Sequence, residues 1–285
     1  MPARQFLRNK PHGWGIKSWA LAESETGYVL NCELYCGKVA NRNGDHNSPS
    51  EVVKRLTQPY NHQGRTVYMD NLFSAVDLFL FLYDNGFMAC GTLRENRKNM
   101  PRDIVGKQRA AVKRLRRGES LWRQAGKLYC VTGLDTKPVV ILSTMPTDTN
   151  SNPPVARSVK QNGVRSQVEI PRSEIIGQYN SYMDGIDLAD KKVMAYRRQT
   201  KGLRWFHKVL WYLMDICVLN VFVMYNASRD PEYPLLLREF REQIATKLIG
   251  GRLHRKAGDY ARQDDEKRLN HITTCTQKDG HICKL

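Results

Sequence analysis

The spacing of apolar and polar positions changes along the chain, and the first two changes predict β-structure. Apolar and β-branched residues dominate Ile16–Ala22 and Gly27–Tyr35, and the polar run Glu23–Thr26 separates them. Two such runs around a short polar link predict a β-hairpin. The apolar run Thr66–Met69 then predicts a short buried strand that ends at Asp70.

The middle of the chain alternates between helical and extended patterns. Apolar residues recur at helical spacing from Ser74 to Asn85-Gly86, which predicts a helix with Ser74 as its N-cap and a glycine stop. Met145–Arg165 is rich in Pro, Ser and Asn, and its composition predicts a surface loop. Three further short apolar runs predict strands at Phe87–Leu93, Leu128–Thr132 and Val139–Ser143.

From Ile175 onward the pattern is helical. Its most apolar part, Val209–Tyr225, is interrupted by Asp215 and Asn220 and spans about 17 residues, which is barely enough to cross a bilayer. We therefore expect a buried core helix at His207–Asn226 rather than a membrane span. Strands followed by helices predict a mixed α/β protein.

Composition adds a strong positive charge to this picture. The 285 residues contain 45 Lys and Arg against 28 Asp and Glu, a formal net charge of +17. An excess of this size favours a polyanionic partner, first of all nucleic acid, over a merely soluble basic protein. The charge is densest in Arg94–Lys127, where 12 basic residues face three acidic ones. We interpret this segment as a basic insertion.

Three aspartates are candidates for metal chemistry. Asp70 follows a predicted strand, and Asp187 and Asp190 lie three residues apart, on one face if their segment is helical. Carboxylate oxygens are the ligands that Mg²⁺ prefers. The alternative is structural: Asp70 could cap a turn, and the later pair could favour a helix N-terminus through the helix dipole.

Several ordered motifs resemble the catalytic domain of piggyBac-type transposases. The resemblance runs from about Arg4 to Tyr225, most of the chain, and its motifs occur in the family's order and at matching separations. They are Arg8–Lys17 (RNKPHGWGIK), Gly64–Ser74 (GRTVYMDNLFS), Cys90–Arg94 (CGTLR) with Met100-Pro101, Val140–Thr144, Tyr179-Asn180 and Asp184–Asp190 (DGIDLAD).

The resemblance implies a ribonuclease H-like fold and the cutting and joining of DNA by three aspartates that hold Mg²⁺. Asp70 matches the second aspartate, Asp187 the third, and Asp190 the acidic residue that follows the third. The family's insertion region, which contacts DNA, matches Arg94–Lys127. The fold class is then α/β, a ribonuclease H-like core that is N-terminally truncated, with a basic insertion and a helical C-terminal part.

We expect four domains or segments on this basis. Residues 1–93 form the first part of the truncated core, and 94–170 form the basic insertion region with a β-hairpin. Residues 171–226 supply helices that complete the catalytic domain, and 227–285 form a charged helical tail with a Cys/His remnant.

The resemblance and the charge together imply double-stranded DNA as partner, leave homodimerisation open, and give no reason to expect a membrane or a small-molecule substrate. They also imply a nuclear location, with Lys107–Arg117 as a weak import signal. The predicted DNA contacts are Arg94, Arg97, Lys98, Arg109, Lys113, Arg114, Arg116, Arg117, Lys191, Lys192, Arg197 and Arg198.

The chain departs from the family at the first aspartate, which lies a short way upstream of the Asn-Lys-Pro motif there. Residues 1–20 contain no Asp or Glu. We therefore expect a DNA-binding, transposase-like chain that is catalytically incomplete alone. The alternatives are an active Mg²⁺-dependent cut-and-paste transposase whose N-terminal part is missing from this sequence, and an RNA-binding or scaffold protein that reuses the fold.

A second departure concerns zinc. The family often ends in a cysteine-rich zinc module, whereas this chain contains no C-x-x-C pair near its end. We expect a frayed tail rather than a zinc site there. The four residues that could bind zinc are His271, Cys275, His281 and Cys283.

Overall fold

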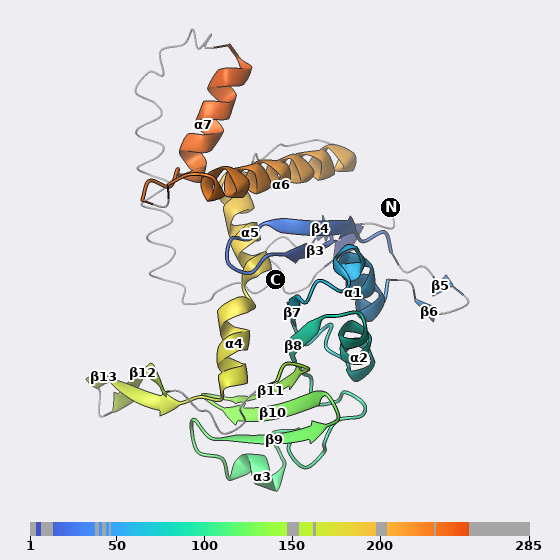
Figure 1. Ribbon diagram of the computed structural model, residues 1–285, viewed down its shortest axis with the longest axis vertical. Helices are drawn as coiled ribbons and strands as arrows, with labels where there is room; N and C mark the ends of the chain where they lie inside the picture. The colour runs from blue at the N-terminus through green and yellow to red at the C-terminus, as the bar shows by residue number, and fades with distance from the viewer. Residues whose placement is uncertain are drawn as a thin grey trace. The chain divides into compact units, whose positions relative to one another are not determined.

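The computed structural model describes residues 4–6, 14–37, 40–41, 44–45, 47–146, 154–161, 164–197, 204–230 and 232–250 (Figure 1). The chain divides into two compact units, Met1–Ile186 and Asp187–Leu285, and each is described by itself.

A five-stranded sheet is the centre of the first unit, with strand order β7-β8-β11-β10-β9. Strands β7 and β8 are parallel, and the other neighbours are antiparallel. A parallel pair needs a crossover, and helix α2, which follows β7, supplies it. The bounds are β7 (Thr66–Met69), α2 (Val76–Asp84), β8 (Met88–Thr92), β9 (Ser120–Ala125), β10 (Leu128–Leu134) and β11 (Pro138–Ser143). The strands and helix predicted here are confirmed.

The main core lies between α2 and this sheet. Phe79 and Leu82 of α2 are fully buried and pack with Ala89 of β8 and Leu142 of β11. The apolar side chains of α2 and the apolar strand residues therefore meet at one interface. This interface fixes the end of β7, and with it Asp70.

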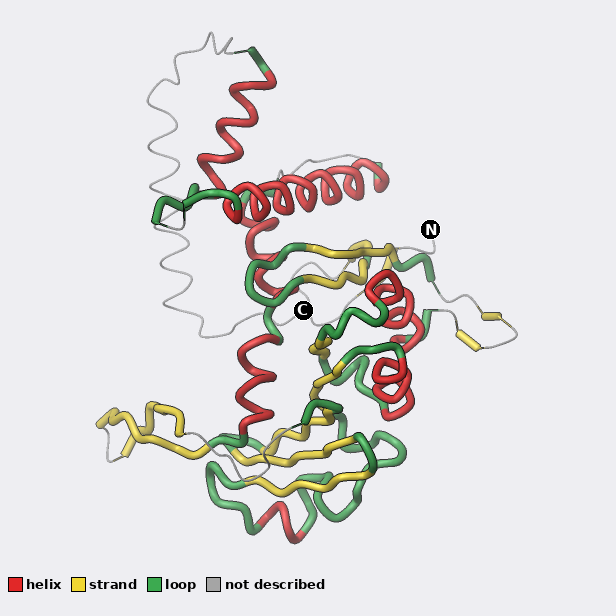
Figure 2. The backbone as a smooth tube through the Cα atoms, in the orientation of Figure 1, coloured by secondary structure: helices red, strands yellow, loops and turns green. Residues whose placement is uncertain are grey.

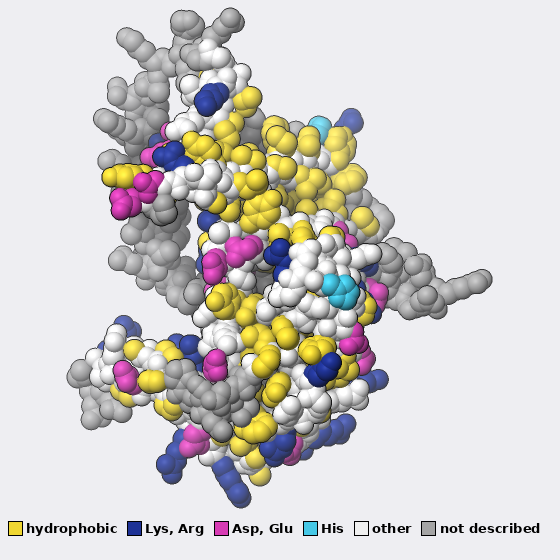
Figure 3. Space-filling view, viewed as in Figure 1, with side chains coloured by type: hydrophobic (Ala, Val, Ile, Leu, Met, Phe, Trp, Pro, Cys, Tyr) yellow, Lys and Arg dark blue, Asp and Glu magenta, His cyan; other side chains and the backbone are white. Residues whose placement is uncertain are grey.

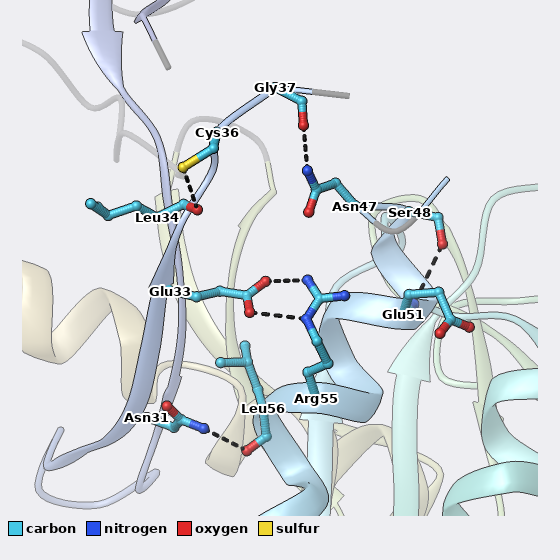
Figure 4. A network of polar contacts seen from close by, with 10 residues as sticks. All are labelled: Asn31, Glu33, Leu34, Cys36, Gly37, Asn47, Ser48, Glu51, Arg55 and Leu56. Atoms are coloured by element: carbon cyan, nitrogen blue, oxygen red, sulfur yellow. Dashed lines mark hydrogen bonds and ion pairs between the residues drawn. The ribbon is translucent and has the colours of Figure 1, made fainter. Parts of the chain in front are cut away.

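The predicted hairpin is confirmed as β3 (Ser18–Ala22) and β4 (Val29–Leu34), which pair antiparallel. Helix α1 (Pro49–Thr57) lies against it, and the ion pair of Glu33 with Arg55 joins the hairpin to the helix at 2.5 and 3.1 Å (Figure 4). Asn31 donates to the carbonyl of Leu56 at 3.2 Å. Polar contacts at the rim thus add to the apolar packing of Trp19 on Leu56 and Val52.

Shorter elements complete the first unit. Two small antiparallel ladders join β1 with β2 and β5 with β6. Helix α4 follows the last strands and packs against β11 through Ile175 and Tyr179. The bounds are β1 (Arg4–Phe6), β2 (Trp14–Ile16), β5 (Ala40–Asn41), β6 (Gly44–Asp45), η1 (Gln58–Tyr60), α3 (Ala110–Lys113) and α4 (Glu174–Tyr182).

The loop predicted for Met145–Arg165 is wrong over most of its second half. Residues Pro154–Gln161 (β12) and Val164–Pro171 (β13) form an antiparallel ribbon that reaches away from the five-stranded sheet (Figure 2). Its sequence signal is Asn162-Gly163 between extended runs, since Asn-Gly is the strongest two-residue hairpin signal. The polar composition hid that signal, because about half of the residues in the two strands are polar.

The basic segment Arg94–Lys127 also contributes to the core. Its last part is β9, the outer strand of the five-stranded sheet, and Ile104, Val105 and Val112 are buried. The charged residues of this segment therefore belong to a stretch of chain that is anchored by buried apolar side chains. Its status as an insertion stays a prediction.

The second unit is helical, as predicted. Its helices are α5 (Gly185–Ala195), which begins at the unit boundary, α6 (Trp205–Ala227) and α7 (Leu237–Leu248). Phe222 and Tyr225 of α6 pack on Phe240 of α7 with ring centroids 5.6 and 5.4 Å apart, and Arg241 pairs with Asp215 at 3.0 Å.

The prediction that α6 is a buried core helix is wrong for most of its surface. Ile216, Leu219 and Phe222 are buried, while most of its other large apolar residues are exposed. The cause is that α6 carries apolar residues on several sides, whereas the stripe of Ile216, Leu219 and Phe222 is the part that is buried. By length and composition alone α6 could also cross a membrane, and 22% of its most apolar window is buried. The exposed residues are Trp205, Phe206, Leu210, Trp211, Leu213, Met214, Val221, Met224 and Tyr225.

Candidate functional site

Asp70 is the first residue after β7 and is exposed to solvent. The buried side chains of Val67 and Met69 anchor the strand, so the residue that follows leaves the sheet at its C-terminal edge. Asp70 also starts a tight turn: its carbonyl oxygen accepts from the backbone N–H of Phe73 at 3.0 Å and from Ser74 Oγ at 3.2 Å. Ser74 is therefore part of this turn, and the N-cap of α2 is Ala75 instead.

The Asp70 carboxylate has a defined orientation. Its Oδ1 accepts from the backbone N–H of Asn71 at 2.6 Å and from the hydroxyl of Thr92 at 3.5 Å. Within the described part of the chain, no residue donates a hydrogen bond to Oδ2. Asp70 therefore presents one held and one available oxygen, and that donor set suits a hard divalent cation.

Thr92 and Tyr179 adjoin Asp70, although sequence reasoning did not single out either as a site residue. Met69 pairs with Gly91 in the parallel β7–β8 register, so Asp70 and Thr92 are the next residues on neighbouring strands. That shared strand edge is the signal that could have found Thr92. The Thr92 hydroxyl in turn lies 3.5 Å from the phenol oxygen of Tyr179.

Tyr179 is a neutral, buried phenol. Its side chain is 7% exposed, and burial raises its pKa, with Asp70, Cys90 and Asp184 adding smaller contributions in the same direction. A raised pKa keeps the proton on the phenol at neutral pH, so Tyr179 can donate a hydrogen bond toward an acidic group.

Gly91 allows the Asp70 turn to pack on β8. A Cβ atom at Gly91 would overlap Ser74 Oγ and would lie 2.7 Å from the carbonyl oxygen of Met69. Only a residue without a side chain permits this approach. The Cys-Gly-Thr run therefore has a packing role beneath the candidate site.

Two arginines donate hydrogen bonds to the residues that follow Asp70. Arg97 donates to the carbonyl oxygens of Asn71 and Leu72 at 3.0 and 2.7 Å, and Arg94 donates to the side-chain oxygen of Asn71 at 2.8 Å. Arg97 is half-buried, whereas Arg94 and Lys98 are exposed. Arg97, predicted to contact DNA, thus uses its guanidinium within the protein.

Other predicted DNA contacts lie on and around α3. Figure 3 shows Lys and Arg side chains projecting from the edge where Figure 1 places α3 and β9. Arg117 is tied to Asp135 at 2.8 Å. The other predicted contacts here have no ion pair with any described residue. The exposed residues are Arg109, Lys113, Arg114, Arg116 and Arg117.

The remaining candidates belong to the second unit. Asp187 and Asp190 occupy one side of α5 by their spacing, and both are half-buried. Asp70 lies in the first unit, so each set is described within its own unit. Among Lys191, Lys192 and Arg197, the first and last are exposed. Arg198 and the zinc candidates His271, Cys275, His281 and Cys283 lie outside the described residues.

Metal binding stays a prediction for these residues. Within the described ranges, no group of three or more His, Cys, Asp or Glu side chains could together hold a metal ion. The exposed carboxylate of Asp70 and its available oxygen nevertheless suit Mg²⁺, which commonly takes one or two carboxylates together with phosphate oxygens.

Comparison with known proteins matches most of the chain. A family model described as Transposase IS4 covers residues 1–222. "PiggyBac transposable element-derived protein 3" of Homo sapiens is 25% identical over 254 residues, 86% of this chain and 41% of that protein. "PiggyBac transposable element-derived protein 2" of Homo sapiens is 21% identical over 251 residues, 85% of this chain and 41% of that protein.

One solved structure shares the fold. It is described as "Cryo-EM structure of piggyBac transposase synaptic complex with hairpin DNA (SNHP)", and it superimposes with a TM-score of 0.72 at 22% identity. The match covers 93% of this chain and 53% of that chain. The chain thus spans about two fifths of the curated relatives and about half of the solved one.

Proposed function

The chain belongs to the Transposase IS4 family and is a piggyBac-type DDE transposase domain, and from this premise we propose that residues 1–285 bind double-stranded DNA. One observation carries the proposal: the chain has a net charge of +17, its positive charge is densest in Arg94–Lys127, and basic side chains around α3 project to solvent there. The solved relative is a synaptic complex with hairpin DNA, which supports the same class of partner.

Phosphate contact accounts best for this surface. Exposed Lys and Arg without acidic partners are hydrated charges that a DNA backbone can neutralise, with release of condensed counterions. Lys113, Arg114 and Arg116 meet this description. Binding through them is insensitive to sequence and weakens steeply with salt.

We further propose that Asp70, Asp187 and Asp190 are the metal-binding carboxylates of this domain, as the resemblance implies. When bound, Mg²⁺ in such sites activates water and stabilises the leaving oxygen of a phosphodiester. The chain itself contributes orientation. The hydroxyl of Thr92 and the N–H of Asn71 fix one oxygen of Asp70 and leave the other available.

Within these 285 residues the family resemblance matches the second and third catalytic aspartates and no residue matches the first. We therefore expect residues 1–285, tested as a purified polypeptide, to bind DNA without cutting it. We also propose a nuclear location for the protein, on the ground of its charge and its basic Lys107–Arg117 run.

Salt-dependent binding to duplex DNA tests this function. The purified chain should bind a 30-base-pair duplex with an affinity that falls linearly in log-log form with salt, and several phosphate contacts give a slope of several units. An affinity independent of salt would refute the assignment of the basic surface. A supercoiled plasmid with Mg²⁺ tests cleavage in parallel: nicking by the native chain, lost in Asp70→Asn, would refute the expected inactivity.

A further inference from the structure

A recess of about 280 Å³ lies in the first unit between the β12–β13 ribbon, helix α4 and the ends of β9 and β10. Cα pairing places Val155 of the ribbon opposite Ile170, and both residues are half-buried in the wall of the recess. The volume is just below the range of about 300–1,000 Å³ that is usual for ligand sites, so it suits a small ligand. The apolar lining residues are Leu134, Val139, Val155, Ile170, Pro171 and Ile176.

Arg172 is a lining residue of this recess whose charge has no counterpart. It precedes Ser173, the N-cap of α4, and is half-buried. Its Nε–H is buried, and the guanidinium has no hydrogen bond or ion pair with any described residue. A half-buried guanidinium has lost part of its hydration, and without a partner that loss is uncompensated. Arg172 therefore has N–H donors available for a ligand.

Gly177 gives the guanidinium of Arg172 its place on α4. A Cβ atom at Gly177 would lie 3.1 Å from Nη2 and 3.4 Å from Nε of the arginine. The glycine thus lets the planar guanidinium lie close against the helix. Packing of this kind restricts the side chain without using its N–H donors, so Arg172 is already ordered before a ligand binds.

The acidic residues of the recess do not neutralise Arg172. Asp135 lines the recess, but Oδ1 accepts from Arg117 at 2.8 Å and Oδ2 from Arg157 at 2.9 Å, so both oxygens are engaged. Glu119 accepts from a backbone N–H at 2.7 Å. One guanidinium thus remains for a ligand, while the two carboxylates in the wall would repel a second negative charge on it.

These features define the chemistry of the ligand. A carboxylate is planar and singly charged, and its two oxygens can accept two parallel hydrogen bonds from one guanidinium. A phosphate group carries up to two charges, and the second would be repelled by Asp135 and Glu119. The apolar lining favours a ligand whose other end is a small hydrocarbon group.

We propose that this recess binds a small organic acid, with its carboxylate on Arg172 and its hydrocarbon part against Val139 and Ile176. Ser173 and Asn180 share the Ile176 face of α4 and add a hydroxyl and an amide group to the lining. The inference goes beyond the proposed DNA binding, because it concerns a recess rather than the α3 surface, and a monocarboxylate rather than a polyanion.

Phenylacetate is the probe that tests the proposal. The native chain should bind it saturably with a dissociation constant of about 1 mM, which is ordinary for a ligand of this size. Phenylacetamide, its neutral isostere, should bind at least about tenfold more weakly, because a neutral group gains less from the guanidinium. Isothermal titration calorimetry measures both affinities.

Substitution of Arg172 tests the carboxylate contact. Arg172→Gln should weaken phenylacetate binding at least about tenfold and leave the weak binding of phenylacetamide unchanged, whereas a loss of structure would weaken both. Gly177→Ala should weaken phenylacetate binding about threefold, because the new Cβ displaces the guanidinium. Arg238→Gln is the matched control, since Arg238 is an exposed arginine on α7, paired with Glu242, and it should bind both compounds as the native chain does.

Glu119→Gln provides a test in the opposite direction. The substitution keeps an acceptor for the backbone N–H and removes a negative charge from the wall of the recess. Phenylacetate should therefore bind about twofold more tightly. Such a gain does not arise from unfolding.

The outcomes separate this site from the proposed function. No saturable binding of phenylacetate up to about 20 mM, or equal binding by Arg172→Gln, overturns the proposal. Tighter binding of phenyl phosphate with the same dependence on Arg172 overturns the choice of a carboxylate. The 30-base-pair duplex should not displace phenylacetate, and displacement would assign Arg172 to DNA binding instead. A chain that binds phenylacetate through Arg172 but no duplex DNA would support the recess and refute the proposed function.

Discussion

The arginines beside Asp70 and the basic residues around α3 lie in the same short segment, yet they face different partners. The guanidinium of Arg97 donates hydrogen bonds to two backbone carbonyl oxygens within the protein, whereas the side chains of Arg114 and Arg116 are exposed to solvent. Sequence counts both kinds alike as positive charge. The difference shows that charge density alone does not tell which basic residues are available to a partner, because hydrogen bonds within the protein engage some of them.

The largest expected effect comes from the exposed group. Lys113→Gln, Arg114→Gln and Arg116→Gln together remove three phosphate contacts, which should lower the salt slope by about 2.7 and weaken duplex binding about 150-fold at 0.15 M salt. The melting temperature should stay nearly unchanged, because exposed substitutions rarely alter stability by more than about 0.5 kcal/mol. Fluorescence anisotropy across a salt series measures the first effect, and circular dichroism measures the second.

The control for this variant is Arg238→Gln with Lys247→Gln on α7, which removes exposed charge elsewhere. An equal loss of DNA affinity per charge removed in variant and control would mean that net charge, rather than the α3 surface, drives binding.

The opposite pattern is expected for Arg97→Ala. The substitution leaves two carbonyl oxygens beside Asp70 without their charged donor, which should cost about 2 kcal/mol of unfolding free energy. In a chain of this size the melting temperature should fall by about 4–8 °C. The salt slope of DNA binding should not change.

Lys98→Ala serves as the neighbouring control, since Lys98 is exposed. It should lower the slope by about 0.9 without a change in melting temperature. If Arg97→Ala instead lowered the salt slope of DNA binding and left the melting temperature unchanged, the assignment of Arg97 to hydrogen bonds within the protein, rather than to the DNA-binding surface, would be wrong.

The smallest expected effect concerns the core beneath the Asp70 turn. Burial raises the pKa of the Cys90 thiol to about 12, and Ser143 offsets part of this rise. The folded chain keeps this proton at a pH where the unfolded chain loses it. Stability is therefore complete below about pH 9 and falls as the pH rises toward 12, with a loss of about 1 kcal/mol by pH 10.

Urea unfolding at pH 8 and pH 10 measures this decline. Cys90→Ala should reduce it, whereas the same change at the exposed Cys217 should leave it intact. An unchanged decline in Cys90→Ala would place its origin elsewhere in the chain.

Sequence patterns predicted the strand before Asp70 and the helix after it, because the residues within each segment largely determine these elements. The apolar run before Asp70 and the helical spacing after it specify strand β7 and helix α2 regardless of distant contacts. By contrast, Thr92 and Tyr179 reach Asp70 through strand register and helix packing, which periodicity within one segment does not encode.

The predictions that failed for β12–β13, α6 and Arg97 also have physical causes. Ribbon β12–β13 buries part of one face only, so its composition resembles a loop, and its turn signal Asn162-Gly163 was the informative part. Helix α6 carries apolar residues on several sides, and periodicity cannot say how much of such a helix is covered. The acceptors of Arg97 lie about 25 residues away in the chain, beyond any local pattern.

Asp135 lies between two basic parts of the first unit, the segment after α3 and the β12–β13 ribbon, and pairs with an arginine of each. One carboxylate restrains two guanidiniums, that of Arg117 and that of Arg157 at the base of the ribbon. Mutation of this one codon to an uncharged residue would release both cations to solvent.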